Sequence, residues 1–203
     1  MVLGILGSGS GSNMQAILDA IDAGTLDATI GLVLSDHKDA FILERAAKRG
    51  IPNGVIDCGG FKTKFPEENQ QETADLLKAA GVELVCLAGF LRLVKRPLLD
   101  AFPNRIMNVH PAMLPAFPGL DAWKQALDAG VDETGCTVHY VDEGMDTGPT
   151  ILQEAVPILP DDTPDSLHAR IQVMEHKLYP QAVSKVISQL SSVSGDDGEP
   201  QTC

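Results

Sequence analysis

Val2-Leu-Gly-Ile-Leu6 is a short apolar run, and Gly7-Ser-Gly-Ser-Gly-Ser-Asn13 follows it directly. Apolar residues then recur at helical spacing, at Met14, Ile17, Leu18 and Ile21. The stretch therefore predicts a strand, a glycine-rich turn and a helix. Two more apolar runs, at residues 30–34 and 54–56, enclose a second helical segment at 40–49. This βαβαβ order favours parallel strands joined by right-handed crossovers.

The rest of the chain continues this alternation and then changes character. Further strands are predicted over residues 84–88, 106–109, 134–141 and 151–156, and further helices over 67–80, 97–102, 121–129 and 165–190. The last two strands alternate as antiparallel neighbours do, and the last helix is expected to break at Pro180. We expect one domain over residues 1–190, with an α/β fold and an open, Rossmann-like, mixed but mainly parallel sheet that carries helices on both faces. An acidic, disordered tail is predicted over 191–203.

The composition argues against several classes of protein. Lys and Arg number 15 against 28 Asp and Glu, and a net charge of -13 disfavours a nucleic-acid surface. No apolar run approaches the roughly 20 residues of a membrane helix, and no basic segment precedes the first strand, so we expect a cytoplasmic protein without membrane contact. The cysteines lack the paired spacing of a zinc site or a disulfide framework: Cys58, Cys86, Cys136 and Cys203. We expect no metal.

The glycine-rich turn is a candidate anion site. It places unhindered backbone N–H groups at a helix N-terminus, where the helix dipole favours an anion such as a phosphate. The dinucleotide fingerprint does not fit, because its third glycine would fall on Ser12 or Met14, and the lysine of a Walker A loop is missing. The alternative is a turn that binds nothing, with Ser12 or Asn13 capping the helix.

A second polar cluster, Asn108-Val-His110-Pro111, ends a predicted buried strand. Asn108 and His110 lie two residues apart and therefore share one face of the strand. An amide can donate to an oxygen that becomes negative, and an imidazole can move a proton near neutral pH. The pair predicts acyl-type group transfer. A core histidine that is satisfied by a carbonyl remains the alternative.

A downstream loop, Asp142-Glu-Gly-Met-Asp146, supplies a carboxylate that could complete this set. Beside His110, Asp146 would raise the pKa of the imidazole and favour its charged form. A solvated turn is the alternative for such a loop. His139 has no adjacent amide in the sequence and is interpreted as structural, and the other histidines are placed on surface elements: His37, His168 and His176.

Taken together, these residues resemble the phosphoribosylglycinamide formyltransferases, folate-dependent enzymes of purine synthesis. The resemblance runs from Val2 to about Leu190. It rests on Ser8-Gly-Ser-Gly-Ser-Asn13, Leu87-Ala-Gly-Phe-Leu-Arg92, Asn108-Val-His-Pro-Ala-Met-Leu-Pro115, Thr137-Val-His-Tyr-Val141, Asp146-Thr-Gly-Pro149 and Gln172-Val-Met-Glu-His176. It implies transfer of the formyl group of 10-formyltetrahydrofolate, a co-substrate, to the amine of 5-phosphoribosylglycinamide without a metal. The expected partners are small-molecule substrates, for a monomer or a homodimer.

The resemblance also implies roles for individual residues. Catalysis is assigned to Asn108, His110 and Asp146. The ribonucleotide substrate is assigned to Gly11, Ser12, Asn13, Met14, Pro111, Gln172 and Glu175. The folate is assigned to Lys64, Phe90, Leu91, Arg92, Leu93, Val94, Asn108, Val141, Asp142 and Asp146. This chain departs from the family pattern at Ala112-Met113, where Ser-Leu is frequent, and at Lys64, where Arg is common.

Three other functions remain as alternatives. A 10-formyltetrahydrofolate hydrolase would use water in place of the amine. Formylation of methionyl-tRNA is disfavoured by the acidic chain. A non-enzymatic nucleotide-binding module would need the glycine-rich turn but would have no use for Asn108, His110 and Asp146 together.

Overall fold

Seven strands form one mixed sheet in the computed structural model, which describes residues 1–61 and 63–193. They are β1 (Val2–Leu6), β2 (Thr29–Ser35), β3 (Asn53–Val55), β4 (Leu84–Leu87), β5 (Ile106–His110), β6 (Glu133–Tyr140) and β7 (Thr150–Pro157). The order across the sheet is β3-β2-β1-β4-β5-β6-β7, parallel from β3 to β5 and antiparallel from β5 to β7. The predicted mixed, mainly parallel α/β sheet is confirmed.

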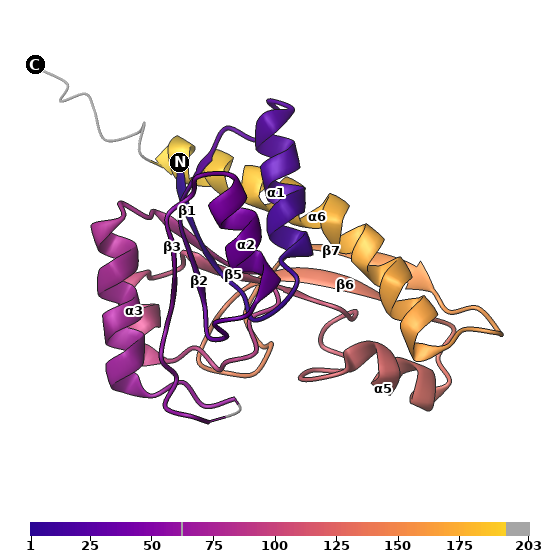
Figure 1. Ribbon diagram of the computed structural model, residues 1–203. Helices are drawn as coiled ribbons and strands as arrows, with labels where there is room; N and C mark the ends of the chain where they lie inside the picture. The colour runs from indigo at the N-terminus through magenta and orange to yellow at the C-terminus, as the bar shows by residue number, and fades with distance from the viewer. Residues whose placement is uncertain (62, 194–203) are drawn as a thin grey trace, which may run out of the picture.

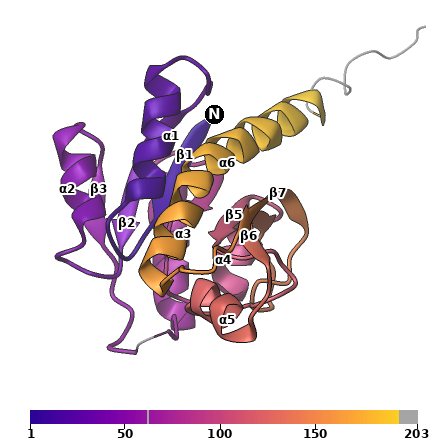
Figure 2. The same ribbon diagram turned by 90° about the vertical axis from the view of Figure 1, so that its right-hand side faces the viewer.

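Helices cover both faces of this sheet (Figures 1 and 2). They are α1 (Ser12–Asp22), α2 (Phe41–Lys48), α3 (Glu67–Ala79), α4 (Arg96–Ala101), α5 (Ala122–Ala129) and α6 (Pro164–Val193). Alternate residues of the parallel strands enter different cores, since Leu84 and Cys86 pack with α1, α2 and α6, whereas Val85 and Leu87 pack with α3 and α4. Strands buried on both faces explain the nearly continuous apolar runs in the sequence.

Helix α6 differs from its prediction. It continues through Pro180 without a break, although a proline inside a helix costs about 3 kcal/mol. Packing on both sides of Pro180 compensates, because Leu178, Tyr179, Ala182 and Val183 are all buried. The helix ends at Val193, so the first three residues of the predicted tail are helical, and 194–203 lie outside the described residues. No helix within the described ranges has the length and apolar character to cross a membrane.

The connections reverse direction at the carboxyl edge of the sheet, between β1 and β4. From β1 the chain moves to β2 on one side, whereas β4 joins β1 on the other side, and ligands of open α/β sheets bind at such a reversal. Tyr179 holds α6 against two of the strands that end at this edge. Its buried hydroxyl donates to the carbonyl oxygens of Leu87 at 2.9 Å and Met107 at 3.2 Å, and so ties α6 to β4 and β5.

Candidate active site

The glycine-rich turn leaves β1 and opens α1 without a side-chain cap. Gly11 is the N-cap residue in the left-handed region, with φ of 71°, and α1 begins at Ser12. A Cβ on Gly11 would lie 2.7 to 2.9 Å from atoms of Ile42, so the close approach of α2 also requires glycine here. Capping by Ser12 or Asn13 is therefore not how this helix begins. The first turn of α1 keeps the amide arrangement that suits an anion.

Asn13 and Glu175 join this turn to α6, which lies beside α1 in both Figures 1 and 2. The Asn13 side-chain amide donates to Glu175 Oε2 at 2.9 Å, and the Glu175 side chain is almost fully buried. Burial raises the pKa of Glu175, and the Asn13 hydrogen bond offsets part of that rise. Asn13 Oδ1 is buried and has no hydrogen-bond partner among the described residues. The two side chains form a polar wall next to the candidate anion site.

The other residues assigned to the ribonucleotide come from α1, from α6 and from the end of β5. Gln172 is almost one helical turn before Glu175, and its amide is 3.4 Å from Nε2 of His168. His168 in turn stacks on Trp123 with 3.7 Å between the ring centroids. Met14 is fully buried in the core, so only its main chain is available to a ligand. Pro111 is half-buried directly after β5.

Asn108, His110 and Asp146 converge at the end of β5, as the sequence predicts. His110 Nδ1 lies 3.4 Å from Asp146 Oδ2, and both side chains are largely buried. The proline-rich loop holds the pair from the other side: His110 Nε2 is 2.8 Å from the Phe117 carbonyl oxygen, and the Gly119 N–H donates to Asp146 Oδ2 at 2.8 Å. The histidine is thus oriented by two acceptors, and the carboxylate by a backbone amide.

His139 belongs to the same cluster, and the fold supplies the amide neighbour that the adjacent sequence lacks. Its Nε2 lies 3.3 Å from Asn108 Nδ2 and 3.6 Å from Asp146 Oδ1. The antiparallel register of β5 and β6 places Asn108 directly opposite His139. That register depends on which strands pair, and the spacing of residues along the chain does not reveal it.

Burial and charge act in opposite directions on His110. Burial is the largest influence and lowers the pKa of His110, whereas the Asp146 carboxylate and the Phe117 carbonyl raise it and His139 lowers it further. Asp146 therefore acts in the expected direction, but the net pKa lies below the ordinary value, which favours a neutral imidazole at neutral pH. Burial acts to raise the pKa of Asp146, but hydrogen bonding and the nearby histidines outweigh it and lower that pKa.

Most of the residues assigned to folate lie in two loops, one after β4 and one after β6. Leu91 and Leu93, after β4, are exposed, whereas Phe90 and Val94 face the core. After β6, the Asp142 carboxylate accepts hydrogen bonds from the N–H of Gly144 at 2.9 Å and the hydroxyl of Thr147 at 2.7 Å, and Val141 is partly buried. Glu143 contacts the segment after β4 through the Arg96 guanidinium at 2.7 Å and the Lys95 ammonium. The loop after β6 therefore contacts the segment after β4.

Arg92 and Lys64 are placed differently from the other folate-assigned residues. The Arg92 side chain is only 7% exposed, and its Nε lies 2.5 Å from Oδ2 of Asp36, which follows β2. Its Nη1 donates to the Phe61 carbonyl. Lys64 Nζ lies 4.9 Å from the centre of the Phe61 ring. Nothing in the neighbouring sequence singles out Asp36, because its partner is 56 residues away.

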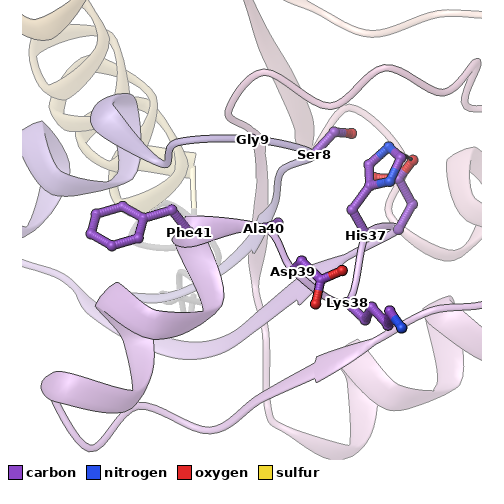
Figure 3. A pocket seen from close by; sticks show the side chains of 8 residues that line it. Ser8, Gly9, His37, Lys38, Asp39, Ala40 and Phe41 are labelled. Atoms are coloured by element: carbon purple, nitrogen blue, oxygen red, sulfur yellow. Dashed lines mark ion pairs between the residues drawn. The ribbon is translucent and has the colours of Figure 1, made fainter.

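A cavity of about 490 Å³ lies next to the glycine-rich turn, between that turn and the start of α2 (Figure 3). Its lining consists of Ser8, Gly9 and the segment Asp36-His-Lys-Asp-Ala-Phe41. Within residues 1–61 and 63–193, no group of three or more His, Cys, Asp or Glu side chains is arranged to hold a metal ion. Cys58, Cys86 and Cys136 are buried free thiols, and Cys203 lies outside the described residues.

Known proteins share both this sequence and this fold. The formyl transferase family model matches residues 1–183. Phosphoribosylglycinamide formyltransferase of Bacillus subtilis is 42% identical over 183 residues, which are 90% of this chain and 93% of that protein. The trifunctional purine biosynthetic protein adenosine-3 of Drosophila melanogaster is 45% identical over 94% of this chain, which spans 14% of the length of that protein.

Solved structures agree with these relatives. Phosphoribosylglycinamide formyltransferase from Bacillus halodurans superimposes with a TM-score of 0.88 at 43% identity, covering 94% of this chain and 97% of that one. Glycinamide ribonucleotide transformylase 1 from Symbiobacterium toebii gives a TM-score of 0.87 at 48% identity, covering 91% and 86%. The chain therefore belongs to the formyl transferase family, in the branch that contains the phosphoribosylglycinamide formyltransferases.

Proposed function

We infer that this protein transfers the formyl group of 10-formyltetrahydrofolate to the amine of 5-phosphoribosylglycinamide, a step of de novo purine synthesis. One observation carries this inference. Asn108, His110 and Asp146 meet at the carboxyl end of β5, at the same edge of the sheet as the carboxyl end of β1, which leads into the uncapped N-terminus of α1. The first group suits acyl-type chemistry, and the helix N-terminus suits the phosphate of a ribonucleotide. The full-length relatives support the same activity.

The acceptor is proposed to bind along α1 and α6. Its phosphate would accept hydrogen bonds from the amides of Gly11, Ser12 and Asn13, where the helix dipole favours negative charge. Glu175 offers a carboxylate to the glycinamide portion. Because Glu175 is buried, it needs a donor, and Asn13 already supplies one. Gln172 lies close enough to Glu175 on α6 to contact the same substrate.

The donor is proposed to bind in the crevice bordered by the loops after β4 and β6. Exposed Leu91 and Leu93 offer an apolar surface for the flat folate ring system. Val141 and Asp142 would contact the donor from the loop after β6. Lys64 is the proposed partner of the donor's glutamate carboxylates. This arrangement would bring the formyl carbon to Asn108 and Asp146.

The proposed reaction begins when the acceptor amine attacks the formyl carbon. A new C–N bond forms, the carbonyl oxygen becomes negative, and the bond from the formyl carbon to N10 then breaks to release tetrahydrofolate. An amide N–H of Asn108 and the imidazolium that His110 forms when it accepts a proton would stabilise the oxygen, a type of interaction worth roughly 3 kcal/mol. Neither the nucleophile nor the leaving group needs a metal ion in this scheme.

Proton movement is the proposed task of His110 and Asp146. The attacking amine loses a proton and N10 gains one, either through His110 or through an ordered water. A His110 with a lowered pKa can accept the proton, and the ionised Asp146 stabilises the imidazolium that results. The Phe117 carbonyl lies at His110 Nε2 in this structure, so the substrate oxygen would share or take over that position.

A spectroscopic assay of tetrahydrofolate formation tests this function. We expect product when both 10-formyltetrahydrofolate and 5-phosphoribosylglycinamide are present, with N-formylglycinamide ribonucleotide as the second product. Formate release without the ribonucleotide would instead identify a hydrolase. Binding of either ligand without turnover would identify a binding module. We propose that the protein acts in the cytoplasm on these small molecules, without a nucleic-acid or membrane partner.

A further inference from the structure

We propose that Asp36 is a positioning residue of the donor site, and that its partner Arg92 acts as an internal support of the donor loop. In this role the Arg92 guanidinium fixes the shape of the loop, Gly89–Val94, and does not offer its charge to the donor. The inference rests on the proposed function. It differs from the role that the family resemblance implies for Arg92, namely contact with the folate.

The ion pair joins two segments on either side of β1. Asp36 directly follows β2 and Arg92 lies in the loop after β4, while β2 and β4 are the two neighbours of β1 in the sheet. The Nε–Oδ2 distance is 2.5 Å, and the side chains are 0% exposed for Asp36 and 7% for Arg92. Arg92 Nη1 also donates to the Phe61 carbonyl. One guanidinium thus links three segments of the chain.

Ser8 fastens the same loop to the glycine-rich turn. The Leu91 N–H donates to Ser8 Oγ at 3.0 Å, and the Ser8 N–H donates to the Gly89 carbonyl at 3.0 Å. Together with the Asp36–Arg92 ion pair, these hydrogen bonds attach the loop to the segments that follow β1 and β2. Leu91 and Leu93, the neighbours of Arg92 in sequence, remain exposed and are free to contact a ligand.

Arg92 is the nearer of the two charged partners that Asp36 has among the described residues. His37 Nε2 lies 3.5 Å from Asp36 Oδ2, and His37 stands at the end of the cavity away from Phe41 in Figure 3. Asp36 Oδ1 is buried without a hydrogen-bond partner in the described part of the chain. A fully buried carboxylate is unfavourable unless a cation is held beside it. Arg92 is the cation in direct contact, so the two side chains depend on one another.

Removing the charge of Asp36 should therefore disturb the donor loop. Arg92 would be left buried without its anion, and it would have to reach water by moving the loop. Because Leu91 and Leu93 move with it, the donor would bind less well. The amides of α1 belong to another segment, so acceptor binding should change little.

The first test compares Asp36→Asn with Asp39→Asn. Asp39 lines the same cavity and is exposed, and its side chain has no hydrogen bond or ion pair with another described residue, so the control removes an equal charge from the same place. We expect Asp36→Asn to raise the donor KM by at least about tenfold, equivalent to ~1.4 kcal/mol, with the acceptor KM changed less than twofold. Asp39→Asn should leave both values unchanged. An unchanged donor KM in Asp36→Asn would overturn the proposal.

A second test separates a supporting Arg92 from one that contacts the donor. Replacing both partners, as Asp36→Leu with Arg92→Met, removes the buried charges together, whereas Arg92→Met alone leaves Asp36 unpaired. We expect calorimetric titration with tetrahydrofolate to show several-fold tighter binding to the double variant than to Arg92→Met. Equal losses in both would assign the guanidinium to direct donor contact. If the unchanged protein forms no tetrahydrofolate from the two substrates, the proposed function fails rather than this inference.

Discussion

The side chains of Asn108 and His110 lie on the same face of β5, and each contacts a partner from a different loop or strand. We expect Asn108→Ala or His110→Ala to lower turnover by on the order of 100-fold, since each removes a stabilising group from the developing oxyanion. The measurement is steady-state tetrahydrofolate formation, with circular dichroism to confirm the fold. Asn53→Ala, at an exposed asparagine on the edge strand β3, is the control. Normal turnover in either site variant would remove the residue from the mechanism.

Asp146 is expected to set the pH dependence through His110. The carboxylate raises the pKa of His110 against the effect of burial, so Asp146→Asn should lower that pKa further. The limb of the kcat/KM profile that reports His110 should then move to lower pH, together with a fall in rate. Asp128→Asn, an exposed carboxylate on α5, should leave the profile in place. A profile that stays unchanged in Asp146→Asn would contradict this coupling.

At the level of elements, the turn between β1 and α1 depends on one glycine. Gly11→Ala would force a Cβ against Ile42 and hold an alanine at φ of 71°, so α1 and α2 would have to separate. Backbone strain of this kind costs roughly 1–3 kcal/mol. We therefore expect the KM for the ribonucleotide to rise at least tenfold and the midpoint of thermal unfolding to fall. Gly9→Ala should be tolerated, because nothing lies within 4 Å of its added Cβ. Equal effects of the two substitutions would refute this account.

The whole molecule should lose stability as the pH falls below neutrality. Burial lowers the pKa of His110, His168 and His176 from the ordinary 6.5. The unfolded chain then binds protons near pH 6.5 that the folded chain does not bind, so stability is present above that pH and decreases below it. The lowered pKa of Asp146 acts in the same direction at lower pH, whereas the raised pKa of Glu175 opposes it.

Thermal unfolding at pH 7.5 and 5.5, at constant ionic strength, measures this effect. We expect a lower midpoint at pH 5.5, and a smaller difference in His176→Gln, which has one fewer histidine with a lowered pKa to protonate. A midpoint that is equal or higher at pH 5.5 would show that the histidines do not control stability in this range.

Local patterns in the sequence were sufficient for most of the secondary structure and for the central pair of the site. Apolar periodicity records which face of an element is buried, so the bounds of strands and helices agree with their predictions within a residue or two, except that α6 extends three residues further. The spacing of Asn108 and His110 places them on one face for the same reason. The break predicted at Pro180 is wrong, because the packing of α6 against the sheet outweighs the local cost of a proline inside a helix. The sequence alone reveals only that cost.

The sequence by itself determined the order of the elements, the glycine-rich form of the first turn and the presence of an amide, an imidazole and a carboxylate suited to group transfer. Only the tertiary structure brought His139 to Asn108 and Asp36 to Arg92. These contacts depend on the β5–β6 register and on the strand order β2-β1-β4. Strand pairing is a property of the whole sheet, since it is the burial of many side chains together that selects one register and one order.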